Sequence, residues 1–203
     1  MRIERVGGDP SQVRVIAVTK GFGSEAVEEA RAAGLTDVGE NYAAELQAKA
    51  PGPPGTDWHF LGRIQRNKVR SLAPLVAMWQ GVARLAEGES IARHAPGARV
   101  LIQVDTTGGL PGRNGCPPED VTALARSITA LDLQLEGLMT VAPPDAAAAA
   151  AAFQSVGSLA DALGLKERSM GMSADFEAAV SAGATMVRIG RGLFGDRPPA
   201  APQ

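Results

Sequence analysis

The feature that most constrains the fold of this chain is a repeated alternation of short apolar runs with helical patterns. Each run is short enough for a buried strand, and the segment after it shows the apolar spacing of a helix. Eight such units follow one another, and no change in composition marks a domain boundary between them. This order favours a parallel sheet covered by helices, because parallel neighbours need a crossover connection.

The apolar runs predict eight strands, at residues 13–19, 37–39, 58–61, 77–80, 100–105, 134–141, 167–172 and 186–190. Helices are expected at 25–33, 42–50, 65–75, 83–94, 118–130, from Asp145 onward, and at 175–182, with a short glycine-rich segment last. We therefore predict one α/β domain over residues 1–203, a (β/α)8 TIM barrel, with a frayed tail at 198–203. An open doubly wound sheet is the alternative, since the second, fourth and seventh strands are weakly patterned.

Charge and cysteine content exclude several classes of partner. The 20 basic and 22 acidic residues give a formal charge of −2, so no net field attracts nucleic acid or an anionic membrane. A single cysteine, Cys116, excludes an internal disulfide, and with two histidines it cannot form the usual zinc cage. No run approaches the roughly 18 apolar residues of a membrane span. We expect a soluble cytoplasmic protein with no metal, no nucleic-acid partner and no membrane partner.

Lys20 follows directly on the first predicted strand. In this type of barrel the functional face lies at the carboxyl ends of the strands, so its amine is expected at the mouth. Apolar walls there would lower the pKa of the amine and make it a nucleophile suited to a Schiff base. The alternative is a solvated lysine at the end of a strand.

A second group of residues follows strands seven and eight, where this fold commonly binds phosphate. Ser173 is expected to be the N-cap of the helix after strand seven, and Gly190 and Gly192 follow strand eight. Free backbone N–H groups at such a place can surround a phosphate. The alternative is that Ser173 only caps a helix and the glycines only form a turn.

A nucleophilic lysine and a phosphate site on one rim are what pyridoxal 5′-phosphate requires. Alternation along the eighth strand points Arg188 away from its apolar neighbours, towards the barrel mouth, where it would donate to the pyridine nitrogen. A permanent cation keeps that nitrogen unprotonated and the ring a poor electron sink. A surface or ion-paired arginine is the alternative.

Several motifs resemble those of one family, the pyridoxal phosphate homeostasis proteins, also called proline synthetase co-transcribed homologues. They are AVTK at 17–20, GENY at 39–42, WHFLGRIQRNK at 58–68, GLM at 137–139, SMGMS at 169–173, VRIG at 187–190 and FG at 194–195. The family's fold is similar to the barrel domain of alanine racemase. The resemblance covers nearly the whole chain and implies a carrier or regulator of vitamin B6 without established turnover.

The resemblance also implies roles for individual residues. Lys20 would form the aldimine, Asn41 would lie beside the cofactor, and Arg188 would meet the pyridine nitrogen. The phosphate would be bound by Ser173, Gly190 and Arg191.

Two positions depart from the family pattern. Arg191 stands where the family usually has threonine, so a charged contact would replace a hydroxyl. Arg113 lies in a loop where the family usually has lysine, and it cannot form a second imine.

Three functions are compatible with these residues. A carrier would bind pyridoxal 5′-phosphate through Lys20, buffer it and pass it to apoenzymes that depend on it, and the resemblance favours a monomer. An amino-acid racemase needs a second acid or base on the opposite face, and the only tyrosine in the chain is Tyr42. A phosphate-sugar enzyme on the same fold is the third alternative.

Residues outside this group have structural interpretations. His59 is expected to be a hydrogen-bonded strand histidine near the mouth. Glu40 would either approach the cofactor or pair with an arginine of the rim. A basic cluster, Arg63, Arg66, Lys68 and Arg70, is expected to be a solvated face that could meet an acidic partner surface.

Overall fold

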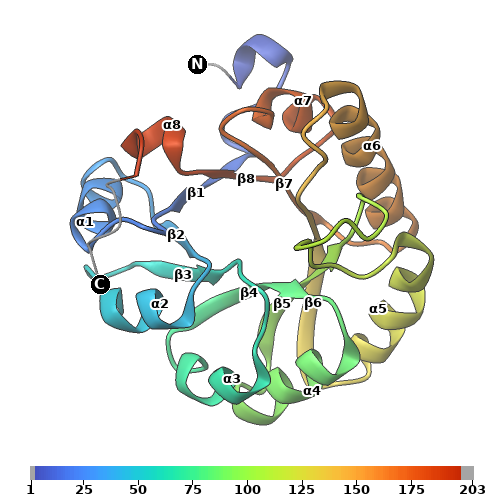
Figure 1. Cartoon of the computed structure of the whole chain (residues 1–203), viewed down its shortest axis with the longest axis horizontal. Helices are drawn as coiled ribbons and strands as arrows, with labels where there is room; N and C mark the ends of the chain where they lie inside the picture. The colour runs from blue at the N-terminus through green and yellow to red at the C-terminus, as the bar shows by residue number, and fades with distance from the viewer. Residues whose placement is uncertain (1–2, 198–203) are drawn as a thin grey trace.

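The computed structural model describes residues 3–197, and these form a closed barrel of eight parallel strands in chain order (Figure 1). The strands are β1 (Arg14–Val18), β2 (Asp37–Glu40), β3 (Asp57–Phe60), β4 (Val76–Val82), β5 (Ala98–Val104), β6 (Leu133–Thr140), β7 (Glu167–Met172) and β8 (Met186–Ile189). The last strand pairs with the first, from Arg14 opposite Met186 to Ala17 opposite Ile189. This pairing leaves the sheet without an edge.

The helices form a ring outside the strands (Figure 1). They are α1 (Glu25–Ala32), α2 (Ala43–Lys49), α3 (Arg66–Leu72), α4 (Leu85–His94), α5 (Val121–Thr129), α6 (Ala146–Ala162), α7 (Phe176–Ser181) and α8 (Arg191–Phe194), with 3-10 turns η1 (Glu4–Val6) and η2 (Pro118–Asp120). Among residues 3–197, none of these helices combines the length and apolar character needed to cross a bilayer.

Alternation along the strands divides the apolar residues between the inside and the outside of the barrel. One cluster joins side chains of five strands, which can meet only in the interior: Ile16, Met78, Leu101, Met139 and Met186. Their neighbours point outward, so that Val100 and Ile102 of β5 lie in the cluster beneath the helices. The two layers hold all eight carboxyl ends of the strands at one rim.

All eight predicted strands are present, and the prediction of a (β/α)8 barrel is confirmed. The doubly wound alternative is wrong, because the pairing of β1 with β8 closes the sheet. The glycine-rich segment after the last strand forms the short helix α8. The tail predicted to fray, 198–203, lies outside the described residues.

Candidate functional site

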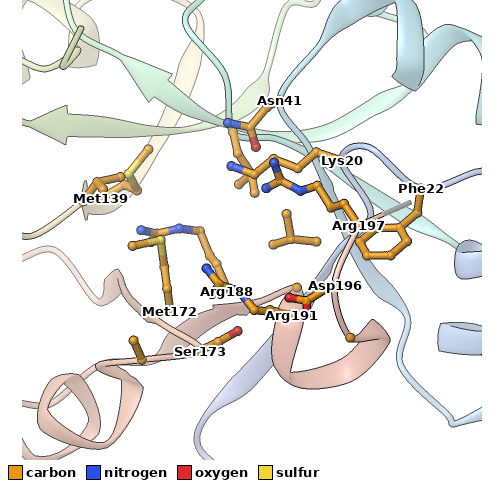
Figure 2. A pocket seen from close by; sticks show the side chains of 16 residues that line it. Lys20, Phe22, Asn41, Met139, Met172, Ser173, Arg188, Arg191, Asp196 and Arg197 are labelled. Atoms are coloured by element: carbon orange, nitrogen blue, oxygen red, sulfur yellow. The ribbon is translucent and has the colours of Figure 1, made fainter. Parts of the chain in front are cut away.

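A cavity of about 720 Å³ opens at the carboxyl ends of the strands. Its walls include all six residues to which the family resemblance assigns a role: Lys20, Asn41, Ser173, Arg188, Gly190 and Arg191. Gly192 is not among the lining residues. Figure 2 shows Lys20, Asn41 and Arg188 extending from different sides towards the same space. The structure therefore brings together residues that lie up to 171 positions apart in the chain, as the difference between 191 and 20 shows.

Lys20 lies two residues beyond the end of β1 and is half-buried in the cavity wall. Burial lowers the pKa of its amine, and the positive charges of Arg197 and Arg188 lower it further. Glu40 and Glu45 act in the opposite direction. Because only an unprotonated amine is a nucleophile, this environment makes Lys20 more reactive at neutral pH than an ordinary surface lysine. The structure places Lys20 in the cavity wall, and its reaction as a nucleophile stays a prediction.

Arg188 is 4% exposed and reaches the cavity from β8. One terminal nitrogen donates to the carbonyl oxygen of Ser169 at 2.6 Å, and the other donates to that of Thr140 at 2.7 Å. Within residues 3–197 it forms no ion pair with a carboxylate. Burial lowers its pKa to about 10, and the charge of Asp175 opposes that fall. A buried cation without a carboxylate partner is a group suited to an electron-rich ligand atom.

A chain of hydrogen bonds inside the barrel holds Arg188 in place. Arg188 donates to the hydroxyl of Ser169 at 3.0 Å, and that hydroxyl donates to Gln80 at 2.6 Å. The amide of Gln80 lies 2.8 Å from Nδ1 of His59, whose Nε2 lies 2.8 Å from Asp37. His59 is therefore a hydrogen-bonded strand residue as predicted. The prediction that His59 lies near the mouth is not met, however. Its ring points to Asp37, the first residue of β2, at the end of the barrel away from the mouth.

The buried link at Ser169 supports a stability prediction. Replacing Ser169 with alanine should lower the free energy of unfolding by about 1–3 kcal/mol, because Gln80 loses its donor in a buried place. Urea unfolding followed by circular dichroism measures this change. Ser71→Ala is the control, since that exposed serine only bonds the carbonyl of Lys68. Equal stability of the two variants would contradict the prediction.

The loops after β7 and β8 are joined through Ser173. Its hydroxyl accepts a hydrogen bond of 3.0 Å from the backbone N–H of Gly192 in α8. The prediction that Ser173 is the N-cap of α7 is wrong. The helix begins at Phe176, its N-cap residue is Asp175, and the Asp175 carboxylate accepts from the backbone of Met172. Ser173 is thus free to face the cavity.

Glycine at position 190 allows the chain after β8 to approach β1 closely. A Cβ atom there would lie 3.1 Å from the carbonyl oxygen of Val18, a tight contact with backbone. The backbone of Gly190 and the first turn of α8 border the cavity beside Arg191. N–H groups in the first turn of a helix lack acceptors within the helix, and Arg191 adds a positive charge. This corner of the cavity suits an oxyanion.

Arg197 and Phe22 line the cavity but were not predicted from the sequence. The stem of Arg197 lies over Gly21, where a Cβ atom would be 2.9 Å from its Cδ. Phe22 packs on Phe194 with ring centroids 5.4 Å apart. Arg197 follows the last strand in a proline-rich stretch without periodicity, so only its positive charge could have signalled a role.

One other prediction changes in the structure. Glu40 does not pair with an arginine of the rim, because Lys49 of α2 reaches its carboxylate at 2.5 Å. The basic cluster is exposed, as predicted for a solvated face, and two of its members, Arg63 and Arg66, border a separate cavity of about 420 Å³ with Arg84. Arg113 is exposed and is not among the described residues that line the large cavity.

Comparisons with known proteins agree with this geometry. Residues 2–198 match the family model described as the alanine racemase N-terminal domain. The pyridoxal phosphate homeostasis protein of Pseudomonas aeruginosa is 42% identical over 98% of this chain and 91% of its own length. The human protein of the same name is 34% identical over 92% of this chain and 77% of its own length.

Solved structures show the same fold. PipY of Synechococcus elongatus, in a structure with pyridoxal 5′-phosphate (PLP) bound, is 32% identical and has a TM-score of 0.81 over 96% of this chain and 100% of that chain. Alanine racemase from Corynebacterium glutamicum has a TM-score of 0.75 at 18% identity, over 100% of this chain and 61% of that chain. At that identity the second comparison supports the fold alone.

Proposed function

Because the chain belongs to the family of the pyridoxal phosphate homeostasis proteins, we propose that it binds pyridoxal 5′-phosphate reversibly in the large cavity. Its function would be to carry and buffer this cofactor in intracellular vitamin B6 homeostasis. The observation that carries the proposal is the convergence of Lys20, Arg188 and the Ser173 corner on one cavity. The structure of PipY with the cofactor bound supports it.

The residues of the cavity fit the chemical groups of the cofactor. Arg188 is buried without a carboxylate partner, so it has a donor to offer the pyridine nitrogen. Lys20 offers a partly desolvated amine to the aldehyde carbon. Ser173, Gly190 and Arg191 would bind the phosphate, and Asn41 would lie beside the ring. When bound, the cofactor supplies an aldehyde that reacts reversibly with amines.

The charge of Arg188 disfavours reactions that need a strongly electron-withdrawing ring. A guanidinium beside the pyridine nitrogen keeps that nitrogen unprotonated, which makes the ring a weak acceptor of electrons. A racemase also needs a proton donor or acceptor on the face opposite Lys20. Tyr42, the one tyrosine of the sequence, is 58% exposed and does not line the cavity. These observations support the carrier over a racemase.

We also propose that the protein acts in the cytoplasm as a monomer and passes its cofactor to apoenzymes that depend on pyridoxal 5′-phosphate. Its one cysteine supports a reducing compartment, because Cys116 is buried and free in the structure. Burial raises the pKa of this thiol to about 11, which makes it unreactive.

Arg191 provides a test of the phosphate corner. Replacing Arg191 with alanine should weaken binding of pyridoxal 5′-phosphate about tenfold, because one charge-assisted hydrogen bond is lost. Binding of pyridoxal, which lacks the phosphate, should not change. Equilibrium dialysis with both ligands measures the difference, and Arg113→Ala is the control outside the cavity. Equal losses for the two ligands would exclude a phosphate contact.

The proposed function is tested with the purified protein and its cofactor. Adding pyridoxal 5′-phosphate and then borohydride should fix one equivalent of cofactor on the peptide that contains Lys20. Racemisation assays with alanine, serine and glutamate should show no turnover. Labelling of another lysine would overturn the assignment of the site, and turnover that depends on Lys20 would overturn the carrier function.

A further inference from the structure

The backbone around Lys20 is held by charged residues of the neighbouring unit. We name Glu40, at the end of β2, with Glu45 and Lys49, both in α2, the α2 charge cluster. Glu40 has no exposed surface and Lys49 is 8% exposed. Charged side chains are rarely buried to this extent without a specific partner, so their contacts require an explanation.

Lys49 is the centre of this cluster. Its ammonium group lies 2.5 Å from one oxygen of Glu40 and 3.2 Å from one oxygen of Glu45. It also donates to the backbone carbonyl of Thr19 at 2.8 Å. The three hydrogen-bond donors of the ammonium group are thus used, and one of them holds the residue that precedes Lys20.

The two carboxylates hold the other residues around Lys20. Glu45 accepts the backbone N–H of Gly21 at 2.7 Å, on the far side of Lys20. Glu40 accepts a hydrogen bond from the hydroxyl of Thr19 at 2.9 Å and another from the backbone N–H of Asn41 at 3.1 Å. The cluster therefore bonds to the backbone on both sides of Lys20 and to the neighbouring cavity residue Asn41.

The hydrogen bonds of the α2 charge cluster lie directly beyond the end of the sheet ladder at β1. The strand β1 ends at Val18, and the N–H of Thr19 still bonds to the carbonyl of Gly39. Beyond that point the chain leaves the ladder and turns, with the N–H of Phe22 donating to the Thr19 carbonyl at 3.0 Å. Lys49 is a second donor to that carbonyl, and the Gly21 N–H takes its partner from Glu45. A buried ion pair adds little net stability, because desolvation of both charges offsets their attraction. The Lys49–Glu40 pair instead fixes the position of the backbone at Thr19, directly before Lys20.

We propose that the α2 charge cluster, centred on Lys49, positions Lys20 for attack on the aldehyde of its ligand. Lys49 is thus a positioning residue, and the inference rests on the proposed function. Covalent capture should depend on Lys49, whereas binding of the pyridine ring and phosphate should not, because Arg188 and Ser173 belong to other units of the barrel.

The test compares two ligands. The amine of Lys20 can form a C=N bond to the aldehyde carbon of pyridoxal 5′-phosphate, and the aldehyde oxygen leaves as water. Pyridoxine 5′-phosphate has an alcohol in place of the aldehyde, so it can bind only non-covalently. In Lys49→Met, capture of the aldehyde, trapped by borohydride over time, should be about 10- to 100-fold slower. The dissociation constant of pyridoxine 5′-phosphate should change less than about twofold, which is within the weak coupling expected of distant groups. Lys166→Met is the matched control, since Lys166 is exposed.

The outcomes separate the inference from the proposed function. If the unmodified protein captures no aldehyde, the proposed function fails and the inference fails with it. If the unmodified protein captures it and Lys49→Met does so at the same rate, only the inference is overturned. Equal losses for both ligands would show a structural role and also overturn it. Should Lys49→Met not fold, Glu45→Ala, at a partly exposed position, removes the Gly21 contact and should slow capture in the same selective way.

Discussion

Replacing Lys20 with alanine should abolish the visible absorption band of protein-bound pyridoxal 5′-phosphate and all trapping by borohydride. The reason is geometric as well as chemical. Lys20 places an amine in the cavity opposite Arg188, and burial together with Arg197 and Arg188 lowers its pKa. No other lysine among the described residues lines the cavity. Absorption spectra and mass spectrometry of the reduced protein measure the loss.

The control for this variant is Lys166→Ala, at an exposed position, which should keep both the band and the adduct. Lys20→Ala should still bind pyridoxine 5′-phosphate, because Arg188 and the Ser173 corner remain. An unchanged spectrum of Lys20→Ala would contradict the role of this amine. If Lys20→Ala also lost binding of pyridoxine 5′-phosphate, the substitution would have changed the shape of the cavity and not only removed the covalent bond to the cofactor.

The parts of the fold that follow from local pattern could be predicted from the sequence. Most strands carry an apolar run, although β2 and β7 are weakly patterned, and eight repeats of a strand and a helix leave few arrangements other than a closed barrel. The same rule places residues that follow the strands on one rim. For this reason Lys20, Arg188 and Gly190, which occur at the carboxyl ends of their strands or directly after, could be assigned to one cavity before the structure was known.

Contacts between units could not be predicted in this way. The sequence shows Ser173 at the start of a helical pattern, and capping is the common role for such a serine. The structure instead uses Asp175, because the chain makes a turn between β7 and α7. Lys49 occurs in a helix among other charged residues. Only the packing of α2 against the loop after β1 shows that this lysine is buried.

Replacing Gly62 with alanine should have a larger effect on stability than Ser169→Ala. The residues just beyond β2 and β3 pack backbone against backbone, and Gly81 near the end of β4 packs against them. A Cβ atom at Gly62 would lie 1.9 Å from the carbonyl oxygen of Asn41, and one at Gly81 would lie 2.4 Å from the carbonyl oxygen of Gly62. Backbone cannot rotate out of the way as a side chain can. We expect a loss of about 2–4 kcal/mol in the free energy of unfolding.

The same substitution should also weaken binding of the cofactor, because the displaced residue, Asn41, lies in the cavity wall. Urea unfolding and the borohydride assay together measure both effects. Gly157→Ala is the control. It places the same methyl group in α6 at 3.4 Å from the nearest atom and should stabilise the helix by up to about 1 kcal/mol. If Gly62→Ala matched Gly157→Ala in stability, the three segments at Asn41, Gly62 and Gly81 would be able to separate at little cost, and the cavity wall at Asn41 would not be rigid.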